Sequence, residues 1–490
     1  MREEWVEIKI EDLLDYIQPT NYIVDSTEYS NRYNIPVLTP GKTFVLGYTN
    51  EEHNVFNSLP VIIFDDFTTA SKYVNFRFKV KSSAMKILVP TSKWVNLKYV
   101  YYYMQTIQHN TDTHKRYWIS IYSKLPIILP PLVEQKAIVS KIEELLSELD
   151  NGIANLDKAK EKLGIYRQAV LKKAFEGELT KEWREGQSEL LSVDNIIKQI
   201  SDEREKYYEK QLKDWEKDVD SWKLNEKQGN KPKKPRKVKK LTPFTTAELS
   251  SFAELPYGWK WVKVDSIHGH DQYSIKAGPF GSALKKSCYV EKGYKIYGQE
   301  QVIANDWKIG DYYVDETKFK ELKSCEVKPG DVLISLVGTV GKILILPHDI
   351  LPGIINPRLI KISLADKFYL PEFFKYYFES TYLKGIYSTK SHGATMDIIN
   401  LGIIQELPFP LLTIEEQKQV VSEIETRLSL CDNILLNIDE GLEKAKALKQ
   451  SILKKAFEGK LLSEVELEQC RKKSDWEPAE KLLERIKEMK

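Results

Sequence analysis

The sequence predicts an α+β protein in which two globular α/β domains are joined by two long antiparallel coiled-coil helices with pseudo-twofold symmetry. Three observations lead to this fold class: a long internal repeat, a coiled-coil pattern within it, and a β-rich region in front of each copy. At 490 residues the chain is too long to fold around a single core, so two or more domains are expected.

The repeat comprises residues 125–179 and 407–461, which align without a gap at a constant offset of 282 positions. The two copies share EQK near their start and LKKAFEG near their end. A segment that recurs in this way predicts two similar modules in one chain.

Each copy of the repeat is expected to form one long helix. The first should run from about Leu132 to Glu176, a length of roughly 65–70 Å. Gly177 is typical of a helix end, and Thr413 with Glu416 forms a capping-box pattern at the start of the second copy. Apolar residues of the first copy recur with the period of a coiled-coil seam: Ile142, Leu145, Leu149, Leu156, Leu163, Tyr166 and Val170.

A helix of this length needs a partner for its seam, so we expect the second copy to pack antiparallel on the first. Gly152 and Ala159 are small residues on that seam. Gly152 and Gly441 interrupt the pattern, which indicates either a close helix approach or a bend.

The repeat divides the chain into segments with different expected structures. In the first domain, we expect strands within residues 36–48 and 59–80 and a helix over residues 95–108. The C-terminal residues 478–490 echo residues 192–204, so the repeat unit extends past the long helix. The expected segments are a globular domain over 1–124, a helical repeat over 125–180, a spacer over 181–250, a second globular domain over 251–406, a second helical repeat over 407–461, and a helical tail over 462–490.

The spacer ends in a basic run from Lys231 to Lys240. This run either contacts nucleic-acid phosphates or forms a solvated, mobile linker. Pro232 and Pro235 favour the linker.

The composition is that of an intracellular protein. The net charge of +2 creates no strong overall field toward nucleic acid or membrane, so any such binding must rest on local patches. The four cysteines are scattered, which fits a reducing compartment. The sequence contains no apolar run of membrane-spanning length, and we expect a cytoplasmic protein without a membrane partner.

The glycine-containing motifs do not support an enzyme. Residues 278–287 lack the glycine that directly precedes Lys-Ser/Thr in a phosphate loop, and residues 336–342 fit a β-hairpin turn better than a dinucleotide fingerprint. The segment Asn356-Pro357-Arg358-Leu359 departs from the Asn-Pro-Pro-aromatic motif of adenine methyltransferases. The seven histidines lack ligand-spaced partners, so we expect no catalytic residue and no metal site.

The motifs taken together resemble the specificity subunit of type I restriction-modification systems. The resemblance rests on their duplicated order: LPIILPPLVEQKAIVSKIEELL, LKKAFEGELT, LPYGWKWVKV, GPFGSALKKS, GDVLISLVGTVGK and LPFPLLTIEEQK. It covers essentially the whole chain.

The resemblance implies a non-catalytic subunit that binds double-stranded DNA and reads a bipartite target. Each globular domain would be a target recognition domain for one half-site, and the helices would set the gap between half-sites. Two modification subunits with S-adenosylmethionine would methylate adenine, and restriction subunits using ATP and Mg²⁺ would join them. No cofactor is implied for this chain.

Candidate DNA-binding residues are the polar and basic side chains of the predicted loops, because Arg, Lys, Gln and Asn suit contacts with phosphates and base edges. In the first domain these are Lys42, Thr68, Thr69, Lys72, Tyr73, His114, Lys115 and Arg116. In the second they are Lys276, Ser282, Lys285, Lys286, Gln299, Thr339, Lys342, Asn356, Arg358, Ser391, His392 and Thr395. The first domain lacks GPFGS and GT-x-G segments, so the two half-sites are expected to differ.

Two alternatives remain open from the residues alone. The chain could be a coiled-coil scaffold that presents two modules to protein partners. A self-contained DNA-modifying enzyme is a weaker alternative, because motifs for a methyl donor or a nuclease are missing.

Overall fold

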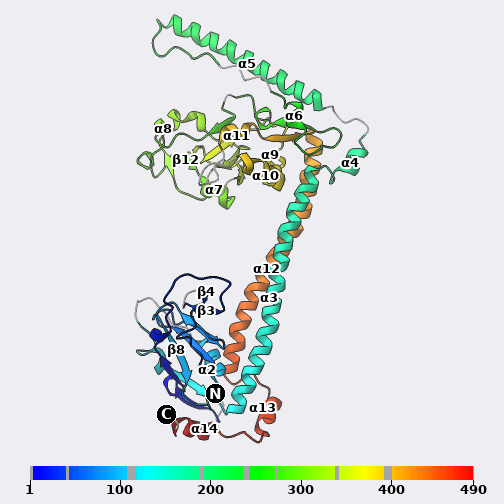
Figure 1. Cartoon of the computed structure of the whole chain (residues 1–490). Coiled ribbons are helices and arrows are strands. Elements are labelled where there is room, and N and C mark those ends of the chain that lie inside the picture. Colours follow the sequence, from blue (N-terminus) through cyan, green and yellow to red (C-terminus); the bar gives the residue numbers. More distant parts are fainter. Residues whose placement is uncertain are drawn as a thin grey trace. The chain divides into compact units, whose positions relative to one another are not determined.

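A computed structural model of the chain describes residues 4–39, 43–107, 116–187, 193–235, 242–271, 273–336, 341–390 and 400–488. The chain forms two compact units: unit 1 contains Met1–Ala159 and Leu436–Lys490, and unit 2 contains Lys160–Leu435. The long helices α3 (Leu132–Phe175) and α12 (Ile414–Phe457) each contribute one end to each unit (Figure 1).

Both long helices are 44 residues long, which confirms the two expected repeat helices. They pack antiparallel within each unit. In unit 1, Asp150 of α3 pairs with Lys449 of α12 at 3.7 Å, and in unit 2 Arg167 pairs with Asp432. At the start of α12, the Thr413 hydroxyl accepts a hydrogen bond from the Glu416 backbone N–H at 3.3 Å.

The seam differs in part from the expectation. Ile142 and Val170 are buried, but Tyr166 is 46% exposed, so its assignment to the seam was wrong. The reason is that two helices cover only one stripe of each other, and no globular domain covers Tyr166. Leu146, which lies off the expected seam, is buried because it joins the core of the first domain.

The two interrupting glycines have different surroundings. A Cβ atom on Gly441 would lie 3.3 Å from Leu156 Cδ1, so the helices approach closely there. A Cβ atom on Gly152 would meet nothing within 4 Å.

The described residues of unit 1 form three small sheets with the orders β1-β9, β2-β8-β5-β6 and β4-β3-β7. Its strands are β1 (Val6–Lys9), β2 (Leu14–Ile17), β3 (Ile35–Leu38), β4 (Val45–Thr49), β5 (Val61–Asp65), β6 (Ser71–Val74), β7 (Lys79–Val80), β8 (Met85–Pro90) and β9 (Pro126–Leu129). Its other helices are α1 (Ile10–Leu13), η1 (Pro19–Tyr22), α2 (Leu97–Met104), η2 (Tyr122–Lys124), α13 (Glu464–Arg471) and α14 (Ala479–Glu488). The strands and the helix expected in residues 36–108 are therefore present, with shorter bounds.

Unit 2 repeats this topology with the orders β10-β18, β11-β17-β14-β15 and β13-β12-β16. Its strands are β10 (Lys260–Lys263), β11 (Ile275–Ala277), β12 (Tyr294–Tyr297), β13 (Tyr313–Val314), β14 (Val332–Ser335), β15 (Ile343–Ile345), β16 (Gly353–Ile355), β17 (Leu359–Ile362) and β18 (Pro408–Leu411). Its other helices are α4 (Lys181–Glu185), α5 (Val193–Leu224), α6 (Thr246–Leu249), η3 (Val264–Ser266), η4 (Lys286–Cys288), α7 (Gln299–Ala304), α8 (Glu316–Glu321), η5 (Lys323–Cys325), α9 (Pro371–Glu379), α10 (Thr381–Lys390) and α11 (Leu401–Gln405).

The duplication therefore includes the globular domains, although their sequences differ. In both units the third sheet pairs one neighbour antiparallel and the other parallel: β3 with β4 and β7, and β12 with β13 and β16. β14 pairs antiparallel with β15, as expected for strands joined by a hairpin; residues 337–340 of the expected turn lie outside the described residues.

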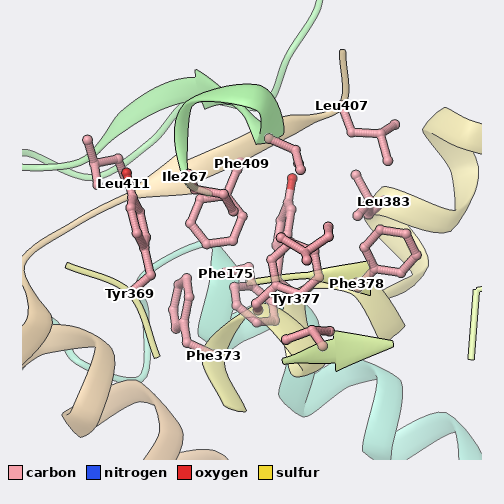
Figure 2. Packing of buried hydrophobic residues seen from close by; sticks show 14 of the residues in the cluster. Phe175, Ile267, Tyr369, Phe373, Tyr377, Phe378, Leu383, Leu407, Phe409 and Leu411 are labelled. Carbon is pink, nitrogen blue, oxygen red and sulfur yellow. The ribbon is translucent and has the colours of Figure 1, made fainter. Parts of the chain in front are cut away.

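The main core of unit 2 lies where the domain meets the ends of the long helices. Phe175 at the end of α3 packs edge-on against Phe373 and Tyr377 of α9, and Phe409 of β18 completes the cluster (Figure 2). Burial of these aromatic side chains fixes the helix end on the domain.

The segments after the long helices are also duplicated, as expected. In unit 2, α5 begins with Val193, Ile196 and Ile200 in the core, whereas in unit 1 α14 buries Leu482 and Ile486. Beyond Arg204, α5 continues to Leu224, and the chain returns along it, where the Trp215 indole donates to the Pro232 carbonyl at 3.0 Å. Of the basic run, residues 236–240 lie outside the described residues.

Among the helices that the structure describes, none is both long and apolar enough to cross a bilayer.

Candidate nucleic-acid interface

Polar side chains of the second domain meet at one edge of its sheets, which we call the second-domain edge. Strands end here at Tyr297, Ser335 and Ile355, and β17 begins here at Leu359. The turn 356–358 joins β16 to β17, held by the hydrogen bond from the Asn356 N–H to the Tyr297 carbonyl at 2.9 Å.

Three of the predicted residues lie together on this edge. Gln299 donates through Nε2 to Ser335 Oγ at 2.7 Å, and Arg358 Nη1 donates to Gln299 Oε1 at 3.4 Å. The Asn356 side chain accepts from the Arg358 backbone N–H at 2.9 Å. Gln299 and Asn356 are half-buried and Arg358 is exposed, so the edge presents amide and guanidinium groups in a fixed arrangement.

The other predicted residues of this domain lie around the edge. Lys342 is exposed beside Ser335, whose N–H donates to the Lys342 carbonyl at 3.0 Å. Ser282, Lys285 and Lys286 are exposed on the loop that follows β11. Lys276 differs, because it lies within β11, opposite the buried Lys361 of β17. The predicted residues Thr339, Ser391, His392 and Thr395 lie outside the described residues.

In the first domain, Thr68 and Thr69 form the turn between β5 and β6. The Thr68 hydroxyl donates to Asp65 Oδ2 at 2.6 Å, and Thr69 has a positive φ of 61°. The strand pairing makes this turn the counterpart of the β14–β15 turn, where Gly341 also has a positive φ of 78°. Lys42, His114 and Lys115 lie outside the described residues.

Arg116 is exposed close to this turn, although it is distant in sequence. The residues after it are held by Asp66: the Trp118 N–H donates to Asp66 Oδ1 at 2.8 Å. Burial lowers the pKa of Lys86, and the charge of Arg116 adds to this effect while Asp66 opposes it. Thr68, Thr69 and Arg116 therefore share one region of the first domain.

Lys72 and Tyr73 lie on β6 rather than in a loop. Lys72 is exposed at the rim of a groove beside α3 and α12. Tyr73 is half-buried: its ring lies 6.0 Å from that of Tyr101 and under the Lys98 ammonium at 5.6 Å.

One group of side chains in the described residues could gather around a cation: Asp25, Glu51 and His53, whose ligand atoms lie within 4.8 Å of one another. The sequence did not indicate this group, because Asp25 is distant in sequence from Glu51 and His53 and only the fold brings them together. Glu51 already pairs with the buried Lys79 at 2.6 Å. Burial raises the pKa of Glu51, but the hydrogen bonds from Lys79, Ser26 and Asp25 hold it below its ordinary value. We therefore assign no metal to the group.

Sequence reasoning missed two contributors to the second-domain edge. Ser335 is at the end of an apolar strand and is recognisable only from its bond to Gln299. Phe280 is 88% exposed in the loop after β11. The glycine on each side of the Pro279-Phe280 pair was the available signal that this ring stands on a turn.

Comparison with known proteins places the chain in one family. The family profile "Type I restriction modification DNA specificity domain" matches residues 2–158 and 280–444, together more than half of the chain. The chain belongs to this family, as the sequence resemblance predicted, and the matches do not support the scaffold alternative.

Two of the curated relatives are specificity subunits from Escherichia coli. The chain is 44% identical over 194 residues to the type I restriction enzyme EcoR124I/EcoR124II specificity subunit, an alignment that covers 37% of this chain and 46% of the relative. With the EcoBI specificity subunit it is 23% identical over 99% of this chain and 92% of the relative.

A solved structure has the same fold. It comes from a study of complex assembly and conformational transition of the type I restriction-modification system, and it matches 94% of this chain and 99% of its own chain at a TM-score of 0.61 and 15% identity. The expected α+β fold, two sheet-containing domains with long helices, is thereby confirmed.

Proposed function

We propose that this chain is the sequence-reading subunit of a type I restriction-modification complex and that it recognises a bipartite DNA target without catalysing a reaction itself. One observation carries the proposal: two domains with the same strand order present different side chains at equivalent edges. Two modules with the same strand order but different side chains at equivalent edges fit two different half-sites.

The recognition domains would comprise residues 1–124 and 251–406, and the helical repeats residues 125–180 and 407–461. The residues predicted from the loops would supply the contacts, with arginine and lysine on guanine or phosphate and glutamine and asparagine on adenine. S-adenosylmethionine would be bound by modification subunits, and ATP and Mg²⁺ by restriction subunits, in the cytoplasm.

The helices offer a docking surface for two copies of one partner. In unit 1, a groove of about 570 Å³ lies between α2, α3 and α12. Lys449, Gln450 and Leu453 of α12 line it together with Leu146 of α3 and Tyr102 of α2.

Unit 2 contains the corresponding groove, of about 230 Å³. Its lining repeats that of the first groove at the offset of 282 positions: Arg167 corresponds to Lys449, Gln168 to Gln450, Leu171 to Leu453 and Leu428 to Leu146. Tyr376 of α9 takes the place of Tyr102. Burial, as the largest cause, raises the pKa of both tyrosines to about 12.

The likeness extends to charge, because each groove has one helix cation paired with an aspartate of the other helix. Leucine and tyrosine beside polar side chains are typical of protein interfaces. Two equivalent grooves support the docking of the same element from each of two modification subunits.

Charge reversal tests this docking. Lys449→Glu should place a second acid beside Asp150 and remove one modification subunit, and Lys449→Glu combined with Arg167→Glu should remove both. Native mass spectrometry of the co-expressed complex would report the stoichiometry. Lys446→Glu is the matched control, since Lys446 is an exposed lysine of the same helix outside the groove, and it should retain two subunits. Two bound subunits in the double variant would contradict the proposal.

DNA reading is tested with one arginine from each domain. Arg358→Ala should relax the second half-site and cost about 1–3 kcal/mol of binding free energy if Arg358 contacts a base, and Arg116→Ala should do the same for the first half-site. Methylation mapping in cells that express the complex would show which half-site changes. The assignment fails if complexes that contain either variant methylate the same sequences as the complex with the original chain.

A further inference from the structure

The loop after β11 exposes an aromatic ring to solvent. Phe280 is 88% exposed, in contrast to Leu284 of the same loop, which is buried. A phenylalanine in water gains no burial energy, so its position needs another explanation than packing.

The backbone is anchored on both sides of Phe280. On one side, the Gly278 N–H donates to the Leu359 carbonyl at 2.9 Å, and Pro279 is buried. A Cβ atom on Gly278 would lie 1.8 Å from the Asn356 carbonyl oxygen, so only glycine allows this approach.

On the other side, the Ala283 N–H donates to the Phe280 carbonyl at 2.8 Å, which closes a turn. Leu284 then enters the domain core. Phe280 is therefore at the tip of a turn whose two ends are fixed.

The surroundings of this tip indicate its ligand. Asn356 and Arg358 lie in the turn before β17, the strand to which the loop is anchored, and Gln299 at the start of α7 contacts Arg358. Lys285 and Lys286 follow Phe280 in the chain and are exposed. Amide and guanidinium groups suit base edges and lysines suit phosphates. An apolar ring among such groups matches the side chains that enter the base stack in other DNA-binding proteins.

The first domain has no such ring at the equivalent place among its described residues. The segment after β2 forms η1, where Pro19 is buried and the Tyr22 ring packs against Phe56 at 5.0 Å. Among the described residues, the feature is specific to the second domain.

We propose that Phe280 is a wedge that inserts between two neighbouring base pairs of the second half-site and unstacks them. The proposal rests on the proposed DNA-reading function. It adds that the second half-site is recognised partly through how easily one base step opens, since unstacking depends on the sequence of that step.

The experiment uses the full chain in complex with its modification subunits and duplexes that carry the target found by methylation mapping. Phe280→Ala should weaken binding to the intact duplex about 10- to 100-fold, as expected for the loss of an aromatic stacking contact. An abasic site, moved one position at a time through the second half-site, should restore most of this loss at a single step, because that step is already unstacked. Phe280→Leu should keep most of the affinity.

Two controls separate the wedge from other roles. Tyr257→Ala removes a ring that is 92% exposed but lies beside α4, and binding should not change. Lys285→Ala should lower the salt dependence of binding, whereas Phe280→Ala should not, since the ring carries no charge.

Several results would overturn the inference: unchanged binding by Phe280→Ala, an equal loss on intact and abasic duplexes, or loss of a modification subunit instead of DNA affinity. If the complex with the original chain shows no sequence preference in DNA binding, the proposed function is wrong, and the proposal that Phe280 is a wedge is wrong with it. If the complex with the original chain discriminates between DNA sequences but no abasic position restores the affinity of Phe280→Ala, only the wedge proposal is wrong.

Discussion

At the scale of single residues, buried glutamates tie the start of each long helix to a segment from elsewhere in the chain. Glu416 of α12 is 1% exposed and accepts from Thr180 Oγ1 and Arg184 Nη1, both at 3.0 Å. Its counterpart Glu134 of α3 accepts from Trp5 Nε1 at 2.9 Å and Trp476 Nε1 at 3.4 Å. The shared EQK motif thus marks a structural joint in each unit.

Removing one partner of a buried carboxylate should destabilise unit 2. Arg184→Ala is expected to lower the free energy of unfolding by about 3 kcal/mol, because Glu416 stays buried with less compensation. Urea unfolding followed by circular dichroism would measure the change. Lys172→Ala breaks an exposed ion pair with Glu176 and serves as the control, with an expected change below about 1 kcal/mol. Equal effects of the two substitutions would count against the joint.

A pH effect is expected at Asp265, which lies close to His268 and accepts from Gln405 Nε2 at 2.6 Å. The His268 imidazole, 3.7 Å away, is the largest cause that holds the pKa of Asp265 below its ordinary value of 3.8, against burial, which raises it. The ionised carboxyl therefore stabilises the folded state fully above the unfolded pKa. This contribution is lost as the pH falls through the lower folded pKa.

Asp265→Asn should consequently cost about 0.5–1 kcal/mol at pH 7, an amount reduced by partial solvent exposure, and should flatten the loss of stability below about pH 4. Thermal unfolding between pH 3 and pH 7 would test this. A variant that loses stability in acid as steeply as the unmodified chain would contradict the assignment.

At the scale of elements, the two long helices are held together by contacts that differ along their length. Near Gly441 the helices are close enough for Leu156 to fill the space that a side chain would take, whereas Gly152 faces open solvent. The sequence offered one explanation for both glycines, but the structure separates them.

This difference predicts opposite outcomes for the same substitution. Gly152→Ala should stabilise unit 1 by about 0.5–1 kcal/mol, because alanine favours the helix and its Cβ meets nothing. Gly441→Ala should gain clearly less, since Leu156 must move. Urea midpoints of the two variants would decide, and an equal gain would show that the close approach carries no cost.

At the scale of the whole molecule, the proposed function rests on two globular domains joined by helices of equal length. We propose that these helices set the gap between half-sites. Because α3 and α12 run antiparallel beside each other, a change of length must be made in both to keep their contacts in register.

Inserting seven residues at facing positions of α3 and α12 preserves the coiled-coil period and lengthens each helix by about 10 Å. The unread gap should then widen by about 3 base pairs, with both half-sites unchanged. Methylation mapping would reveal the new target. An insertion in α3 alone is the control, which should destabilise the helix pair without defining a new gap. An unchanged gap after the matched insertion would refute the proposal that the helices set the gap between half-sites.

The sequence by itself determined the duplication, the two 44-residue helices and the family, because periodic apolar positions and repeated motifs are local patterns. Several candidate DNA-contact loops could also be predicted from their turn residues. Only the tertiary structure decided that both domains share one strand order and that Gln299, Ser335 and Arg358 meet at one edge. It also decided that Phe280 stands in solvent and that Tyr166 does not enter the seam. These outcomes depend on which strands pair and which surfaces cover one another, and such contacts between distant residues are not encoded in any local period.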